Sequence, residues 1–102
     1  MSTTKLFDDE AQRLLDVLWE LPIGLRIALD STRVTVSTGV VPRVTVWGGP
    51  QDTASDVVRM FAHDFRRCCR AFAEDEHQDP ERRAEWAAWA DRVEEVLGDG
   101  DR

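Results

Sequence analysis

The stretch RVTVSTGVVPRVTVWGG, residues 33–49, contains the tetrapeptide Arg-Val-Thr-Val twice, ten residues apart. In each copy apolar and polar residues alternate with the period of two that is typical of a strand with one buried face. β-branched residues such as Val and Thr favour this pleated geometry. Gly39 lies between the two copies and supplies a permissive backbone for a turn. The stretch therefore predicts a hairpin of two antiparallel strands.

The same alternation begins upstream of this hairpin. After Pro22, the large aliphatic residues Ile23, Leu25, Ile27 and Leu29 alternate with small or polar residues. Only a few residues separate this segment from the hairpin, and short connectors permit antiparallel neighbours but exclude the long crossovers that parallel strands need. We therefore expect a three-stranded antiparallel sheet.

A register follows from the rule that the large apolar residues share one face of the sheet. With turns at Asp30 and Ser31 and about Val40, the predicted pairs are Ile27 with Val34, Leu25 with Val36, Val36 with Val44, and Val34 with Val46. On the other face, Arg33 is expected across from Trp47, and Thr35 across from Thr45. The repeated tetrapeptide thus places like residues side by side.

Three further segments have the three-to-four-residue period of amphipathic helices, and they cover residues 7–21, about 54–73 and 80–97. Residues typical of helix ends flank them: Pro22, Thr53 with Asp56, Asp79 with Pro80, and Gly98. The order helix, three strands, two helices predicts an α+β fold with helices packed on the aliphatic face of a β-meander. We expect one domain over residues 1–102, with an ordered core of about 6–97 and short tails.

Composition narrows the function classes. The chain has 102 residues and a formal net charge of −7, which disfavours nonspecific binding to nucleic acid. It has neither the apolar region of a secretory signal nor an apolar run long enough to span a membrane, so we expect a cytoplasmic protein that does not bind membranes. The only cysteines, Cys68 and Cys69, are adjacent on a predicted helix and diverge too far to bridge, which favours reduced thiols.

The predicted outer face of the sheet is the first candidate site. It carries Arg26, Arg33, Thr35, Arg43, Thr45 and Trp47. Residues 22–50 hold three basic groups and one acidic group, and they are the only positive third of the chain. Arg and Trp are enriched at binding hot spots, so the face fits a protein partner or nucleic acid. Alternatively, it is an ordinary solvent-exposed face on which the Trp47 ring packs against the aliphatic part of the Arg33 side chain. A further alternative is that the third helix covers it.

Helix faces form a second, weaker candidate. Arg59, Arg66 and Arg70 share one stripe of the middle helix, and Trp86 lies on the last helix. These residues could bind a partner. Alternatively, the arginines pair with acids of neighbouring helices and Trp86 packs in the core, or Trp86 projects outward and anchors a dimer.

No catalytic or cofactor motif stands out. His63, Cys68, Cys69 and His77 lack the paired spacing of zinc ligands, so we expect no metal and no cofactor. His63 and Asp64 are adjacent and would not face each other on a helix, which makes them a poor acid–base pair. We therefore expect no enzymatic activity but a small acidic protein-interaction module, an adaptor, inhibitor or regulator, that binds another protein and forms a possible homodimer. The alternative is a nucleic-acid-binding protein that uses the outer sheet face.

Overall fold

The computed structural model describes residues 7–29, 33–49 and 51–98. Its elements are α1 (Asp9–Glu20), β1 (Arg26–Leu29), β2 (Val34–Ser37), β3 (Thr45–Gly48), α2 (Ala54–Glu74) and α3 (Pro80–Leu97). The strands form one antiparallel sheet in the order β1-β2-β3, which confirms the predicted α+β fold. The predicted turn at Asp30 and Ser31 and both predicted tails lie outside the described residues.

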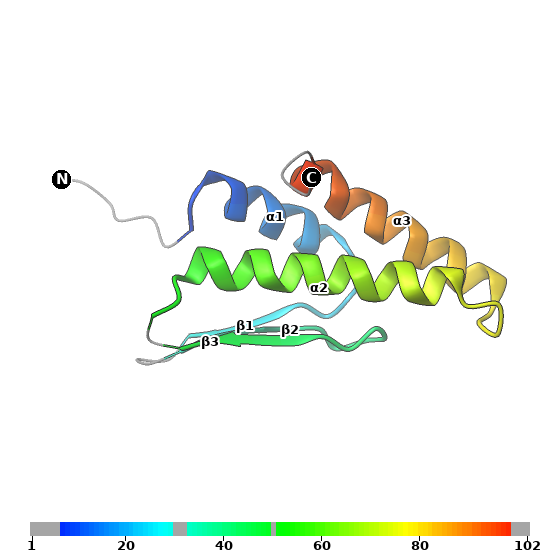
Figure 1. The fold of residues 1–102 in the computed structure, drawn as a ribbon, viewed down its shortest axis with the longest axis horizontal. Coiled ribbons are helices and arrows are strands. Elements are labelled where there is room, and N and C mark those ends of the chain that lie inside the picture. Colours follow the sequence, from blue (N-terminus) through cyan, green and yellow to red (C-terminus); the bar gives the residue numbers. More distant parts are fainter. Residues whose placement is uncertain (1–6, 30–32, 50, 99–102) are drawn as a thin grey trace.

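All three helices lie on the same side of the sheet (Figure 1). α2 packs against β2 and β3, while α1 and α3 pack against α2 and against each other. The third helix therefore does not cover the opposite face of the sheet. Within residues 7–29, 33–49 and 51–98, no helix is both long and apolar enough to cross a membrane.

The core forms where the aliphatic face of the sheet meets α2. Val36 on the central strand is fully buried, as are Phe61 and Phe65 on α2. The two phenyl rings stack with their centroids 5.9 Å apart, and Trp89 of α3 stacks on Phe65 at 6.3 Å. Burial of these side chains supplies the main driving force for folding, because each fully buried large apolar side chain contributes about 1.5–3 kcal/mol.

The predicted register is wrong by two residues in both hairpins. Ile27 lies opposite Val36 instead of Val34, and Val36 lies opposite Val46 instead of Val44. The remaining two predicted pairs, Leu25 with Val36 and Val34 with Val46, are displaced in the same way. A shift of two keeps every side chain on its predicted face, because the side-chain period of a strand is also two. The apolar pattern therefore identifies the faces without identifying the partners.

Thr38 explains the shift in the second hairpin. Its backbone N–H donates to Val44 O at 3.0 Å, and its hydroxyl accepts from Val44 N and donates to Pro42 O, both at 2.9 Å. These bonds close a loop over residues 39–43. The closing pair is therefore Thr38 and Val44, which centres the turn beyond Val40.

β1 is shorter than the alternating segment that predicts it. The chain bends at Gly24, which has φ of +64°, and a Cβ there would lie 3.2 Å from Gly39 Cα. Ile23 is nevertheless fully buried beside this contact. At the other end Leu29 is 57% exposed, although we predicted it in the core, because α2 packs on β2 and β3 and leaves β1 less covered.

The structure confirms the predicted cap at Thr53, has a cap at Asp8 that we did not predict, and lacks a side-chain cap at Asp79. Thr53 Oγ1 accepts from the backbone N–H of Asp56 at 3.1 Å at the start of α2. At the start of α1, the Asp8 carboxylate accepts from Ala11 N at 2.9 Å. Asp79 stands at the cap position of α3, but its side chain makes no capping hydrogen bond. There Pro80 sets the first helical turn.

Candidate binding face of the sheet

The outer sheet face is the surface that the helices leave uncovered. We define it as the side chains that alternate with the buried valines, together with the residues that lead into β2 and β3: Arg26, Ala28, Arg33, Thr35, Ser37, Arg43, Thr45 and Trp47. All of them are exposed except Thr35 and Ser37, which are half-buried on the central strand. The structure thus brings all six residues of the first candidate site onto one open face.

Trp47 is the largest apolar side chain on this face and is 59% exposed. Its cross-strand neighbour is Thr35, not Arg33 as we predicted, and Thr45 lies opposite Ser37 instead of Thr35. Arg33 still reaches the indole diagonally, with its guanidinium carbon 5.0 Å from the ring centroid. One side of the ring therefore carries a cation, in the contact expected from sequence.

The charge on the outer sheet face is of one sign. Its described residues include three exposed arginines and neither Asp nor Glu, while the whole chain has a net charge of −7. The acidic residues concentrate on the helices instead, where Asp and Glu occupy the first turns and outer faces. This segregation gives the molecule one positive face on an otherwise negative body.

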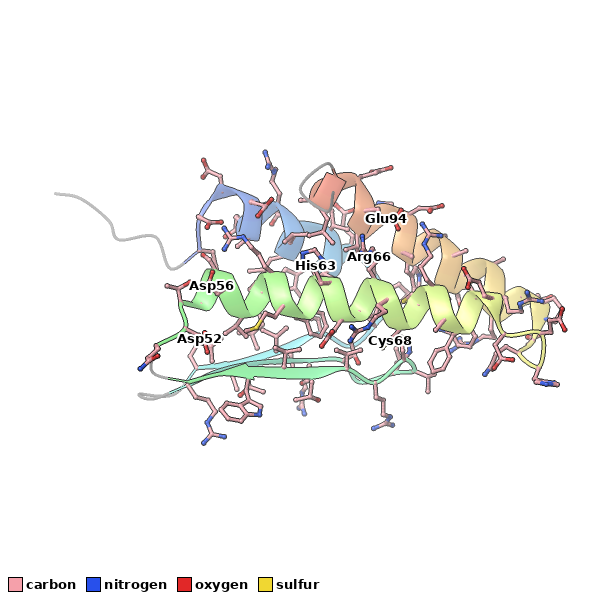
Figure 2. All side chains as sticks on the ribbon, in the orientation of Figure 1. Asp52, Asp56, His63, Arg66, Cys68 and Glu94 are labelled. Atoms are coloured by element: carbon pink, nitrogen blue, oxygen red, sulfur yellow. The ribbon has the colours of Figure 1, made fainter. Side chains whose placement is uncertain are left out.

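The arginine stripe of α2 serves the helix packing. Arg70 donates to Asp91 and Glu94 of α3, both at 2.7 Å, and these carboxylates raise its pKa. Arg59 donates to Glu10 of α1 at 2.7 Å. Arg66 is half-buried and lies on the side of α2 that faces α3 (Figure 2). The ion pairs of Arg59 and Arg70 agree with the structural alternative and occupy the charges that a partner would need.

Trp86 lies in the core and not at the surface. It is 3% exposed, its ring packs on Phe72 with centroids 5.2 Å apart, and its Nε1 donates to Val41 O at 3.2 Å. Arg82 covers it, with the guanidinium carbon 5.3 Å from the ring centroid. The 39–43 loop and α2 enclose the ring. Trp86 therefore does not project outside the monomer core, where it could anchor a dimer.

An open pocket of about 600 Å³ lies where the N-termini of α1 and α2 meet. It is lined by Phe7, Asp8, Asp9, Thr53, Ser55, Asp56 and Arg59. Arg59 pairs with Asp8 as well as Glu10 and donates to Asp56 at 3.2 Å. The backbone N–H of Ala11 and then the Arg59 guanidinium hold the pKa of Asp8 below its usual value. Arg59 thus links the N-terminal ends of α1 and α2 through ion pairs.

The thiols and imidazoles do not form a reactive centre in the described residues. Burial raises the pKa of the Cys69 thiol to about 12, and Cys68 is only partly exposed. Across residues 7–29, 33–49 and 51–98, no group of three or more His, Cys, Asp or Glu side chains is placed to hold a metal ion.

Sequence reasoning missed two exposed apolar residues. Leu29 ends β1 at 57% exposure and Val41 sits in the 39–43 loop at 45% exposure. Trp19 on α1 is also 55% exposed. A signal existed for Trp19, because at 100° per residue it lies at the edge of the stripe that the buried Ala11, Leu14 and Leu18 form on α1.

Comparison with known proteins adds no assignment: no family model matches the chain, and no match was found among curated proteins or among solved structures.

Proposed function

We propose that this chain is a non-enzymatic protein-interaction module that binds an acidic surface of another protein through the outer sheet face. The observation that carries the proposal is Trp47, which stands 59% exposed among three exposed arginines on an uncovered sheet. Trp and Arg dominate binding hot spots, because they combine a large contact area with directional hydrogen bonds or charge. The segregated positive charge favours encounter with an anionic partner.

The outer sheet face contributes no residue to the buried core of the described residues. The buried valines and α2 supply the core on the other side of the sheet. The contact between Arg33 and Trp47 contributes only about 0.5–1 kcal/mol at an exposed site. A binding role is the better account of why a tryptophan and three arginines gather there.

Two features support a non-catalytic reading. His63 and Asp64 are neighbours on α2, so their side chains diverge by about 100°. Cys69 is fully buried and its raised pKa leaves little thiolate at neutral pH, which makes it a poor nucleophile.

The test is direct binding to a purified partner. A partner recovered from the native cell extract is purified and titrated calorimetrically with the wild type, with Trp47→Ala, and with the double reversal Arg33→Glu and Arg43→Glu. The matched control is Arg13→Glu with Arg67→Glu, because both residues are exposed on helices and the charge change is the same.

We expect Trp47→Ala to weaken binding about 30-fold or more, which corresponds to the roughly 2 kcal/mol of a hot spot. The sheet reversal is expected to weaken it further, and the helix control to have little effect. Equal losses in the sheet reversal and the helix control, or full affinity in every variant, would contradict the proposal.

Binding of single-stranded nucleic acid is a second candidate, favoured by the aromatic ring beside Arg33 on a flat sheet. Successive bases stack on such rings while arginines follow the backbone. The net charge of −7 opposes it. The test is fluorescence anisotropy of a labelled dT12 oligonucleotide at low salt, with charge reversal at Arg26, Arg33 and Arg43. Binding that these reversals and added salt abolish supports this candidate, and an unchanged anisotropy removes it.

A further inference from the structure

β3 is an edge strand, and its hydrogen-bonding pattern shows which peptide groups face outward. Thr38 N donates to Val44 O at 3.0 Å, so the peptide groups of Val44 point at β2. In an antiparallel pair this direction alternates with every residue. Val46 and Gly48 therefore bond to β2, while the N–H and C=O of Thr45 and Trp47 point to the open edge.

The side chains beside this edge also alternate. Arg43, Thr45 and Trp47 are exposed on the outer sheet face, and Arg43 lies two residues before the start of β3. Val44 and Val46 lie on the helix side, where Val46 is only half-buried. A strand added here would meet a cation, a hydroxyl and an indole on one face and aliphatic surface on the other.

We propose that the partner contributes an extended acidic segment, which adds to the sheet as a fourth strand along β3. This inference rests on the proposed function and specifies the partner. The segment carries Asp or Glu at the positions that face Arg43 and Trp47, and apolar residues at the alternate positions that face Val46. Strand addition of this kind takes its affinity from main-chain hydrogen bonds and its specificity from alternate side chains.

The side chains on the outer face favour β3 over the other edge. By the same alternation, Ile27 and Leu29 direct their peptide groups to the open side of β1. The outer face of β1 carries only Arg26 and Ala28. The edge at β3 likewise has one arginine, but it adds the hydroxyl of Thr45 and the indole of Trp47 in alternate positions, which offer an added strand more contact area.

Charge and backbone chemistry also select the occupant. A second copy paired along β3 would bring arginines of both copies onto the same face, where like charges repel. A nucleic acid lacks the alternating N–H and C=O groups that the open edge of β3 would bond. An acidic peptide satisfies both the main-chain edge and the positive face.

The probe is a synthetic peptide in which Glu and Val alternate over six residues, titrated into the ¹⁵N-labelled protein and followed by amide chemical shifts. Two N-methyl isomers, blocked at the Glu or at the Val amides, are the backbone controls, because only one set of N–H groups points at β3. A Lys-Val peptide is the charge control. The protein variants are Arg43→Ala and its counterpart on the other edge, Arg26→Ala.

We expect shifts and slowed hydrogen exchange at Thr45 and Trp47, loss of binding for one N-methyl isomer only, and no binding of the Lys-Val peptide. Arg43→Ala is expected to weaken binding more than Arg26→Ala does. Equal binding of both isomers would overturn strand addition while leaving the proposed function intact. Shifts that appear on raising the protein concentration alone, or with dT12 and not with the peptide, would also overturn it, as would no shift at all. The partner titration with the sheet and helix reversals tests the proposed function independently.

Discussion

Replacing individual tryptophans with alanine tests which of them stabilise the core and which belong to the binding face. Trp89 is 6% exposed and stacks on Phe65, which is fully buried. Trp47 is 59% exposed on the outer sheet face. If the account is right, Trp89→Ala removes structural support, while Trp47→Ala removes mainly a binding group.

The structure sets the magnitudes for both variants. Truncation of a buried aromatic to Ala costs about 3–5 kcal/mol, because it loses transfer free energy and leaves a cavity. Trp47→Ala loses the Arg33 contact, about 0.5–1 kcal/mol, and the cross-strand pair with Thr35, about 0.2–1 kcal/mol. The expected costs in unfolding free energy are therefore about 4 and about 1 kcal/mol.

Urea unfolding followed by far-ultraviolet circular dichroism measures both values, with thermal melting as a second readout. One kcal/mol corresponds to about 4–8 °C in Tm for a domain of this size, so Trp47→Ala should melt within about 10 °C of the wild type. Trp89→Ala is expected to melt far lower or to be unfolded, since total stabilities are about 5–15 kcal/mol. A Trp47→Ala variant as damaged as Trp89→Ala would refute the reasoning, because it would make the outer sheet face structural.

Three further predictions concern the helix ends, the sheet and the thiols. The pKa of Asp8 is lowered in the folded state, so its contribution to stability is present above about pH 4 and is lost as the pH falls through the folded-state pKa. Asp8→Asn should therefore be less stable than the wild type at pH 7. The difference between their urea midpoints should close in strong acid. Gly48→Ala should be destabilised by about 1–3 kcal/mol in urea unfolding, since a Cβ there would overlap Val57 Cγ2, and an unchanged midpoint would contradict this. Iodoacetamide at pH 8 should modify Cys68 before Cys69 in the native protein, because burial raises the pKa of Cys69 to about 12, and mass spectrometry that finds equal rates would count against this burial.

The elements of the fold were predictable because each has its own period. The three-to-four-residue spacing of Leu14, Leu15 and Leu18 predicts α1, and the alternation around Val36 predicts β2. Each pattern reflects which side chains a single element must bury, so it needs no knowledge of the neighbours. The faces of the sheet follow from the same patterns, and the structure has every strand valine on the predicted side.

The register and the ion pairs depend on contacts between elements, which no local pattern encodes. The closing pair of the second hairpin is set by the bonds of Thr38 to Val44 and Pro42, and these come from a five-residue loop that the repeated tetrapeptide does not reveal. Arg59 also pairs with Asp56 in its own helix, but its other partners lie at the start of α1 and those of Arg70 lie on α3, between 21 and 51 residues away in the chain.

The openness of the candidate face was likewise beyond the sequence. The apolar stripe of the last helix, with Trp86 and Trp89, predicts that the helix buries one side but not which neighbour it packs against. In the structure α3 packs on α1 and α2, which leaves the outer sheet face uncovered (Figure 1). The residues of the candidate face follow from the strand period, whereas their exposure follows from where α3 lies.

Ionic quenching of tryptophan fluorescence tests whether Trp47 stands on an open, positively charged face of an acidic protein. Trp19→Phe leaves Trp47 as the exposed tryptophan, and Trp47→Phe leaves Trp19, which precedes Glu20 on α1. Arginines near Trp47 attract iodide and repel caesium ions. We expect a higher ratio of iodide to caesium quenching constants for Trp47 than for Trp19. An equal or lower ratio for Trp47, or no quenching by iodide, would contradict it.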